Sequence, residues 1–177
     1  MTNDPNARPP GASGFALVSP DFADGDTLPV WARSGIARAG GEDRSPTLHW
    51  EDAPSGARSF AVTVHDPDAS AANGWWHWAV FNIPAKITSL AQDAGNPEAG
   101  LLPAGAITLV GTDGLERFVG AAPPAGHGEH RYIFTVSALD SERLDLPPGS
   151  DAASLDRAIA DHIVAQAQLV GVAETPA

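Results

Sequence analysis

Proline and glycine interrupt this chain too often for it to form a bundle of long helices. Its 177 residues include 18 glycines and 16 prolines, which are spread between short apolar runs. Proline cannot donate a backbone hydrogen bond, and glycine is the usual residue in tight turns. Short apolar runs separated by turn residues favour a β-rich domain. The length fits one domain, expected over residues 15–177 after a flexible polar lead-in over residues 1–14.

Two segments give the clearest strand signals. Residues 59–65 alternate, and their apolar face is formed by Phe60, Val62 and Val64. Residues 75–83 are apolar on both faces, which is typical of a central strand. Simple alternation within that strand places His77 and Trp78 on opposite faces. Further strands are expected over residues 15–18, 28–31, 45–50, 107–110, 131–139 and 169–172, with a helical turn near Glu98.

The pattern favours a longer helix only near the C-terminal end. Ser150 is a suitable N-cap, and Asp151 follows it as an acidic residue in the first turn. Apolar residues then recur four positions apart, as Leu155, Ile159, Ile163 and Ala167. This spacing predicts one apolar helical face and a helix that ends near Gln168.

Charge and composition exclude several classes of partner and chemistry. The net charge is −12, and the ten basic residues are scattered, with Lys86 the only lysine. Because no basic stripe exists, we expect neither nucleic-acid nor anionic-membrane binding. The absence of cysteine excludes disulfides and thiolate chemistry. No apolar run approaches the ~20 residues of a membrane helix, and the first residues do not resemble a secretory signal, so we expect a cytoplasmic protein without integral membrane contact.

Three polar residues occupy positions where binding side chains often lie. Asp66 closes one strand, His77 lies on the apolar central strand, and His130 opens a later strand after Pro123-Pro124. We expect them to converge on one cleft that suits a small anion, because imidazole changes its charge near neutral pH. Each also has a purely structural interpretation: a turn cap, a core histidine and a surface histidine. The remaining histidines, His49, His65, His127 and His162, are interpreted as structural.

Other functions are compatible with the same residues. Two histidines and one carboxylate match a common metal-ligand set, but no local spacing of a zinc motif is present, so we expect no metal and no cofactor. A hydrolase or lyase that uses His77 and His130 as acid and base is an alternative. The sequence has no G-x-S-x-G elbow, and Ser70 is the only serine near these histidines. A protein-binding inhibitor with a vestigial pocket is a third interpretation.

Linked motifs in this order resemble those of the phosphatidylethanolamine-binding protein family, in its bacterial Raf-kinase-inhibitor-like branch. The family's D-P-D-A-P stretch corresponds to residues 66–70, and its W-x-H-W-x-V-x-N-I strand corresponds to residues 75–83. Its G-x-x-P-P loop and H-R-Y sequence correspond to residues 120–124 and 130–132. The resemblance extends over about residues 15–172.

The resemblance implies a mainly β fold, a β-sandwich around a large antiparallel sheet, with the C-terminal helix added. It implies a shallow pocket for a small anion, phosphate or phospholipid headgroup, lined by Asp66, His77, Pro123, His130 and Tyr132. It adds Asp68, Trp76 and Gly120 as supporting neighbours, and a homodimer. A protein partner is a further expectation, although the kinase inhibition of eukaryotic members does not transfer.

Two departures from the family pattern bear on the pocket. Ser70 stands where the first motif ends in proline, so one rim is less rigid. Ala121-Ala122 precedes Pro123-Pro124 in place of the usual proline with cysteine or glycine, which changes the loop. These departures affect the size of ligand that fits.

Overall fold

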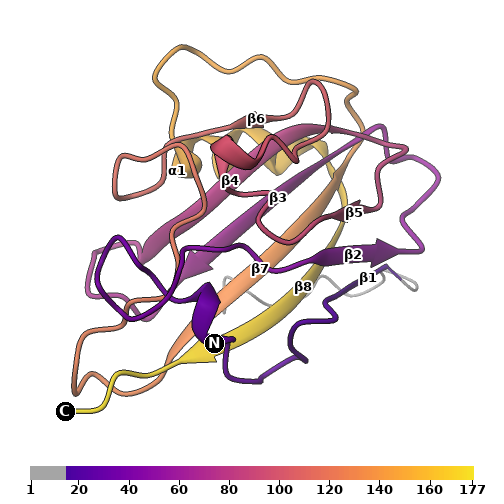
Figure 1. Ribbon diagram of the computed structural model, residues 1–177. Helices are drawn as coiled ribbons and strands as arrows, with labels where there is room; N and C mark the ends of the chain where they lie inside the picture. Colours follow the sequence, from indigo (N-terminus) through magenta and orange to yellow (C-terminus); the bar gives the residue numbers. More distant parts are fainter. Residues whose placement is uncertain (1–14) are drawn as a thin grey trace, which may run out of the picture.

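The structure is a computed structural model that describes residues 15–177. Two antiparallel sheets form its framework (Figure 1). The smaller sheet has the order β1 (Ala16–Val18), β2 (Leu48–Glu51), β5 (Ser89–Leu90). The larger has the order β6 (Ile107–Thr108), β4 (Trp75–Pro84), β3 (Ser59–Asp66), β7 (His130–Leu139), β8 (Ile163–Ala173). Residues 15–177 also contain one α-helix, α1 (Ala152–Ile159), and three 3₁₀ turns, over Val30–Ala32, Pro97–Ala99 and Ala160–His162. The predicted lead-in over residues 1–14 lies outside the described residues.

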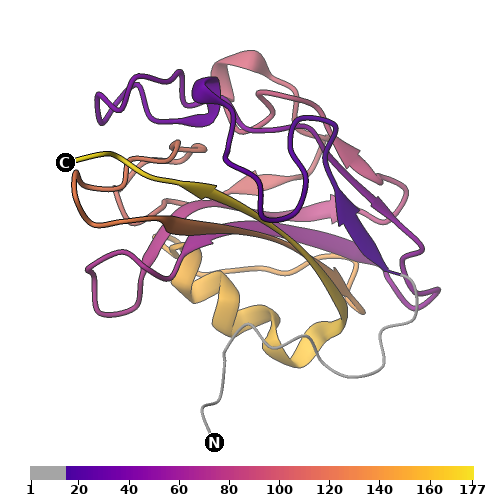
Figure 2. The ribbon, with the colours of Figure 1, turned by 90° about the horizontal axis from the view of Figure 1, so that it is seen from below.

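The elements form three layers, with the large sheet in the middle (Figure 2). The small sheet covers one face, and the main core between the sheets includes Trp50, Phe60, Trp78 and Phe134. Helix α1 covers the other face, where Leu155 and Ile159 pack with Ala61, Phe81 and Leu139. The predicted β-sandwich around a large antiparallel sheet, with a C-terminal helix, is therefore confirmed.

A bulge in β4 changes the faces that alternation predicts for this strand. Val64 of β3 pairs with Trp78, but the next residue, His65, pairs with Trp76, so that His77 is the extra residue. A bulge of this kind lets two successive side chains point to the same face. His77 and Trp78 both face the core between the sheets, whereas Trp76 packs on the α1 side. The prediction of opposite faces for His77 and Trp78 was therefore wrong.

The C-terminal helix is shorter than predicted. It begins after Asp151, whose side chain accepts a hydrogen bond from the Ser154 amide, so that Asp151 and not Ser150 is the N-cap. It ends at Ile159, and residues 163–173 instead form β8, paired with β7 along its length. A spacing of four fits a strand as well as a helix, because four is twice the strand repeat. Tertiary pairing with β7 decides between the two.

Smaller differences concern the connecting segments. The predicted strand over residues 28–31 is instead a 3₁₀ turn that begins after Pro29. The strand expected over residues 107–110 is limited to Ile107–Thr108, although Val110 forms an isolated bridge. The helical turn near Glu98 is confirmed as Pro97–Ala99. Within residues 15–177, no helix is long and apolar enough to cross a membrane.

Candidate functional site

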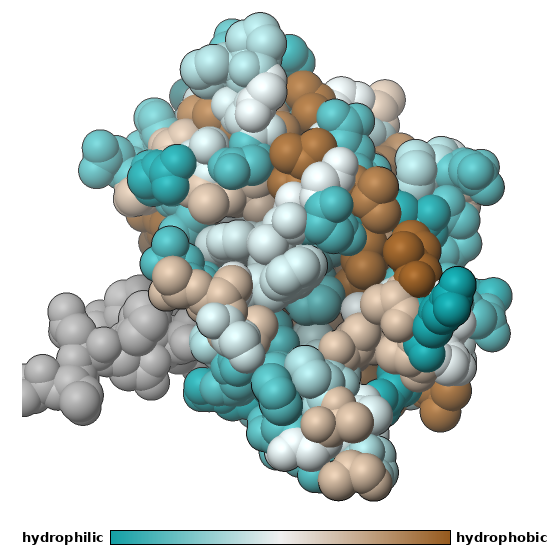
Figure 3. All heavy atoms as spheres, turned by 90° about the vertical axis from the view of Figure 1, so that its left-hand side faces the viewer, coloured by the Kyte–Doolittle hydropathy of each residue, from teal (hydrophilic) through white to brown (hydrophobic). Residues whose placement is uncertain are grey.

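A cavity of about 370 Å³ opens where β3 ends and β4 and β7 begin. The strands contribute Asp66, Trp75, His77, His130 and Tyr132 to its lining. Loops contribute Ile36, Ala37, Ala69, Ser70, Ala71, Asp113, Val119, Gly120, Ala122, Pro123 and Pro124. Figure 3 shows this end of the molecule, where apolar and polar residues are interspersed at the surface. The cavity therefore offers a largely apolar wall around a few polar groups.

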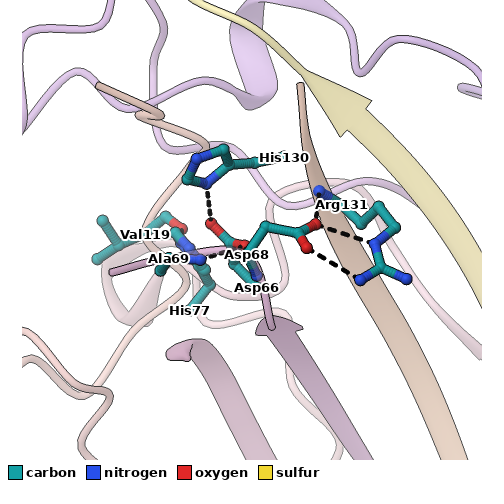
Figure 4. Close-up of polar contacts among 7 residues, drawn as sticks. All are labelled: Asp66, Asp68, Ala69, His77, Val119, His130 and Arg131. Carbon is teal, nitrogen blue, oxygen red and sulfur yellow. Dashed lines mark hydrogen bonds and ion pairs between the residues drawn. The ribbon is translucent and has the colours of Figure 1, made fainter. Parts of the chain in front are cut away.

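Asp66 is the buried acid at the base of the cavity, with 3% of its surface exposed. One carboxylate oxygen, Oδ1, accepts hydrogen bonds from the backbone amides of Asp68 and Ala69, at 2.8 and 3.1 Å. The other, Oδ2, lies 2.8 Å from Nδ1 of His130 (Figure 4). The turn cap that the sequence predicts for aspartate and the predicted contact with the pocket are both present, because the two oxygens divide these roles.

Asp68 points away from the cavity and binds Arg131. Its carboxylate accepts hydrogen bonds from the Arg131 backbone amide, Nε and Nη2, each at 2.9 Å (Figure 4). The Arg131 side chain, through its hydrogen bonds, holds the pKa of Asp68 below its ordinary value despite the opposing effect of burial. Asp68 therefore holds the start of β7, and with it His130, against the turn after β3.

His77 is buried and has one ring nitrogen occupied. Its Nδ1 lies 2.7 Å from the carbonyl oxygen of Val119. Burial lowers the pKa of His77, and the Val119 carbonyl and the charge of Asp66 oppose this shift only in part. The imidazole is therefore neutral at neutral pH. A carbonyl only accepts, so the single ring proton lies on Nδ1.

Tyr132 packs against His77 in the site. Its ring meets that of His77 edge to face, with the centroids 5.1 Å apart. Burial and the charge of Asp66 raise the pKa of Tyr132, and a hydrogen bond from the Ala122 backbone opposes this. The phenol therefore stays protonated and can donate its hydrogen. His130, next but one along β7, is also buried, with 3% of its surface exposed.

A second buried carboxylate, Asp43, holds the outer wall of the cavity. Its Oδ1 accepts from the amide of Gly120 at 2.8 Å, and its Oδ2 accepts from Gly35 and Ile36. Burial opposes ionisation, but these hydrogen bonds together lower the pKa of Asp43. A Cβ at Gly120 would collide with the backbone of Ala32 and Arg33, so only glycine fits there. Asp43 thus ties residues 34–43 to the wall that ends at Pro123.

The structure brings most of the predicted site residues together. Asp66, His77, Gly120, Pro123, His130 and Tyr132 all line the cavity. The expectation that Trp76 supports the pocket needs correction, because this ring lies on the opposite face of β4 from His77 and packs against His65, with the ring centroids 4.3 Å apart. Trp75 lines the cavity in its place.

Sequence reasoning also missed Asp43, Ile36 and Asp113. The alternation of β4 carried a signal for Trp75, since it shares the parity of His77. Asp43 and Ile36 carried none, because they come from a glycine-rich loop whose path only the tertiary structure sets.

The charged side chains that line the cavity include carboxylates and no lysine or arginine from the described residues. These carboxylates are those of Asp66 and Asp113. Within residues 15–177, no group of three or more His, Cys, Asp or Glu side chains is arranged to hold a metal ion. An anion at this site must therefore be held by imidazole, hydroxyl and backbone N–H donors.

Comparison with known proteins agrees with this arrangement. The sequence model of the phosphatidylethanolamine-binding protein family matches residues 18–174. The chain belongs to this family. It is 40% identical over 156 residues to the UPF0098 protein YbhB of Escherichia coli (strain K12), covering 88% of this chain and 98% of that protein. Membership supports a ligand-binding protein in general.

A solved structure and a further relative extend the comparison. The crystal structure of YbcL from E. coli, described as a new member of the mammalian PEBP family, superposes with a TM-score of 0.88 at 37% identity, covering 92% of this chain and 99% of that one. A protein of Mycobacterium tuberculosis named as a lipoprotein, LppC, is 35% identical over 173 residues, covering 98% of this chain and 79% of that protein.

Proposed function

We propose that this protein binds a small oxyanion, such as phosphate or the phosphate of a phospholipid headgroup, in the cavity beside Asp66. The observation that carries the proposal is the His130 imidazole, which Asp66 holds through Nδ1 while the ring lines the cavity. The Asp66 carboxylate fixes the orientation of this ring through Nδ1 and leaves Nε2 to a ligand, to which an imidazolium ring donates a hydrogen bond. No activated nucleophile is needed for this role.

Neighbouring groups supply further donors. The Tyr132 hydroxyl stays protonated, and Ser70 brings a hydroxyl to the rim. Ser70 also has a backbone N–H, which the proline of the family motif lacks. The apolar wall, which includes Trp75 and Pro123, suits the carbon atoms attached to a phosphate ester.

Calorimetric titration with inorganic phosphate tests the proposal. We expect one site per chain in the wild type and a loss of affinity of about 10-fold or more in His130→Ala, because a hydrogen bond to a charged group contributes about 1.5–3 kcal/mol. His49→Ala, on the exposed face of β2, is the matched control and is expected to bind as the wild type. Equal affinity in the wild type and His130→Ala would contradict the proposal.

A second measurement distinguishes a phospholipid headgroup from a free phosphate as the ligand. Co-sedimentation with vesicles of phosphatidylethanolamine, compared with vesicles of phosphatidylcholine, reports recognition of a lipid headgroup. Binding to inorganic phosphate without retention on either vesicle identifies a free small anion as the ligand.

One observation supports the alternative function, a hydrolase or lyase that uses His77 and His130 as acid and base. The two imidazoles differ, because His77 is neutral with its proton on Nδ1, whereas His130 is paired with a carboxylate. Such a difference is what separates a general base from a general acid. Turnover of a panel of phosphate and carboxylate esters, lost in both His77→Gln and His130→Ala, would favour a hydrolase or lyase over a binding protein.

Partners, assembly and location stay predictions. Light scattering measures the expected homodimer, and ligand-dependent melting separates a binding protein from an inhibitor with a vestigial pocket. Fractionation of cells tests the expected cytoplasmic location, to which the relative named as a lipoprotein offers the alternative.

A further inference from the structure

The two imidazoles present different atoms to the cavity. Nδ1 of His77 donates its hydrogen to the Val119 carbonyl at 2.7 Å, so Nε2 of the neutral ring carries a lone pair. Nδ1 of His130 donates to Asp66, so its Nε2 is the atom available to a ligand. His77 thus offers an acceptor, while His130 in its charged form offers a donor.

The His77 acceptor has no partner within residues 15–177. Among these residues the ring forms a hydrogen bond through Nδ1 alone, and it lines the cavity. In the described part of the chain, two fully buried side-chain atoms have no hydrogen-bond partner, the indole nitrogens of Trp50 and Trp78. Nε2 of His77 is not one of these fully buried atoms. This nitrogen is therefore left to whatever occupies the cavity.

Both oxygens of the carboxylate at the base of the site already have hydrogen-bond donors. Asp66 already accepts three hydrogen bonds, from two backbone amides and His130. The titratable groups around His77 are Asp66 and His65 from β3, Asp113 from the adjoining loop, and His130 and Tyr132 from β7. Of these, the protonated Tyr132 hydroxyl adds a donor.

We propose, on the basis of the proposed function, that the site selects an oxyanion that still carries a proton, such as a singly protonated phosphate ester, over an unprotonated one of equal charge. The P–O–H group donates to Nε2 of His77, and the remaining oxygens accept from His130 and Tyr132. An unprotonated oxyanion places a lone pair against the lone pair of Nε2, so this acceptor is left unsatisfied once the ligand covers it.

Methyl phosphate and methyl sulfate form a matched pair of probes. At about pH 6 methyl sulfate is a monoanion, and about half of the methyl phosphate is a monoanion of nearly the same shape that still carries a hydroxyl, since its second pKa is about 6. Calorimetric titration of the wild-type protein at this pH is expected to give at least about a 10-fold preference for methyl phosphate. Raising the pH to about 8 leaves about 1% of the phosphate ester protonated, so its affinity should fall by about 50-fold.

Methyl sulfate does not titrate in this range, so any pH dependence of its binding measures the protein groups alone. In His77→Gln the side-chain amide can turn either its oxygen or its NH₂ group toward the ligand. The preference should therefore fall to within about threefold. His49→Gln, on an exposed face of the small sheet, should keep the wild-type preference. Thermal melting of each variant checks that it is folded, and the wild-type comparison decides the question without them.

The outcomes separate the inference from the function beneath it. Equal binding of methyl phosphate and methyl sulfate by the wild type, with both lost in His130→Ala, would overturn the proton selectivity and leave the anion site standing. Failure of both probes to bind at either pH would overturn the anion site and the selectivity together. A preference that His77→Gln retains in full would assign the selectivity to another residue and overturn the role of His77.

Discussion

Replacing Asp66 by alanine should strongly destabilise the fold, because this buried carboxylate accepts three hydrogen bonds. The bond from His130 is charge-assisted and contributes about 1.5–3 kcal/mol, and the two from backbone amides contribute about 0.5–1.5 kcal/mol each. Together these give a loss of about 2.5–6 kcal/mol in the free energy of unfolding, or roughly 5–24 °C in Tm for a domain of this size. Urea unfolding at neutral pH, with calorimetry for Tm, measures both quantities.

Asp68→Ala is the matched control for this change. Asp68 also accepts three hydrogen bonds, all from Arg131, but the two side chains keep 51% (Arg131) and 30% (Asp68) of their exposure. Solvent screens such a pair, so the expected loss is about 1 kcal/mol or less. An Asp66→Ala variant that loses no more stability than Asp68→Ala would refute the reasoning that burial makes the Asp66 contacts strong.

Further predictions concern pH, the rim and the helix. Because burial lowers the pKa of His77, the unfolded chain binds a proton below about pH 6.5 that the folded chain does not bind. The free energy of unfolding should therefore fall as the pH drops, by up to about 1.4 kcal/mol per pH unit. Urea unfolding of His77→Gln should show no such contribution to the slope. Ser70→Ala should weaken phosphate binding by about 2- to 10-fold in calorimetry, through loss of one hydroxyl donor, and unchanged affinity would remove Ser70 from the site. Leu155→Ala should lower the free energy of unfolding by about 2–5 kcal/mol and leave phosphate affinity unchanged. Replacing the exposed Asp156 by alanine should lower it by less than about 0.5 kcal/mol. Equal losses in the two variants would contradict the packing of α1.

The sequence predicts the central strands and the gathering of the polar residues well, for a physical reason. A residue at the end of an alternating strand has a definite face, so Phe60, Val62 and Val64 predict the face of Asp66. The motif order also places His130 at the start of β7, beside that strand end.

The features that the sequence did not predict depend on tertiary structure. One extra residue in β4 moves His77 to the core side and Trp76 away from it, and no local signal marks a bulge among apolar residues. The run from Ile159 to Ala167 fits either period, and pairing with β7 makes most of it strand. Asp43 acts on Gly120 across 77 positions of sequence, a contact that local pattern cannot reveal.

Long-range proton–nitrogen NMR spectra of the histidine rings, recorded with and without inorganic phosphate at about pH 6, test the central claim most directly. We predict a proton on Nδ1 and none on Nε2 of His77 in the free protein. Phosphate should shift the Nε2 signals of His77 and His130 and leave those of His49 and His162 unchanged. Ring signals of His77 and His130 that stay unchanged at high phosphate, or a His77 ring with its proton on Nε2, would contradict this claim.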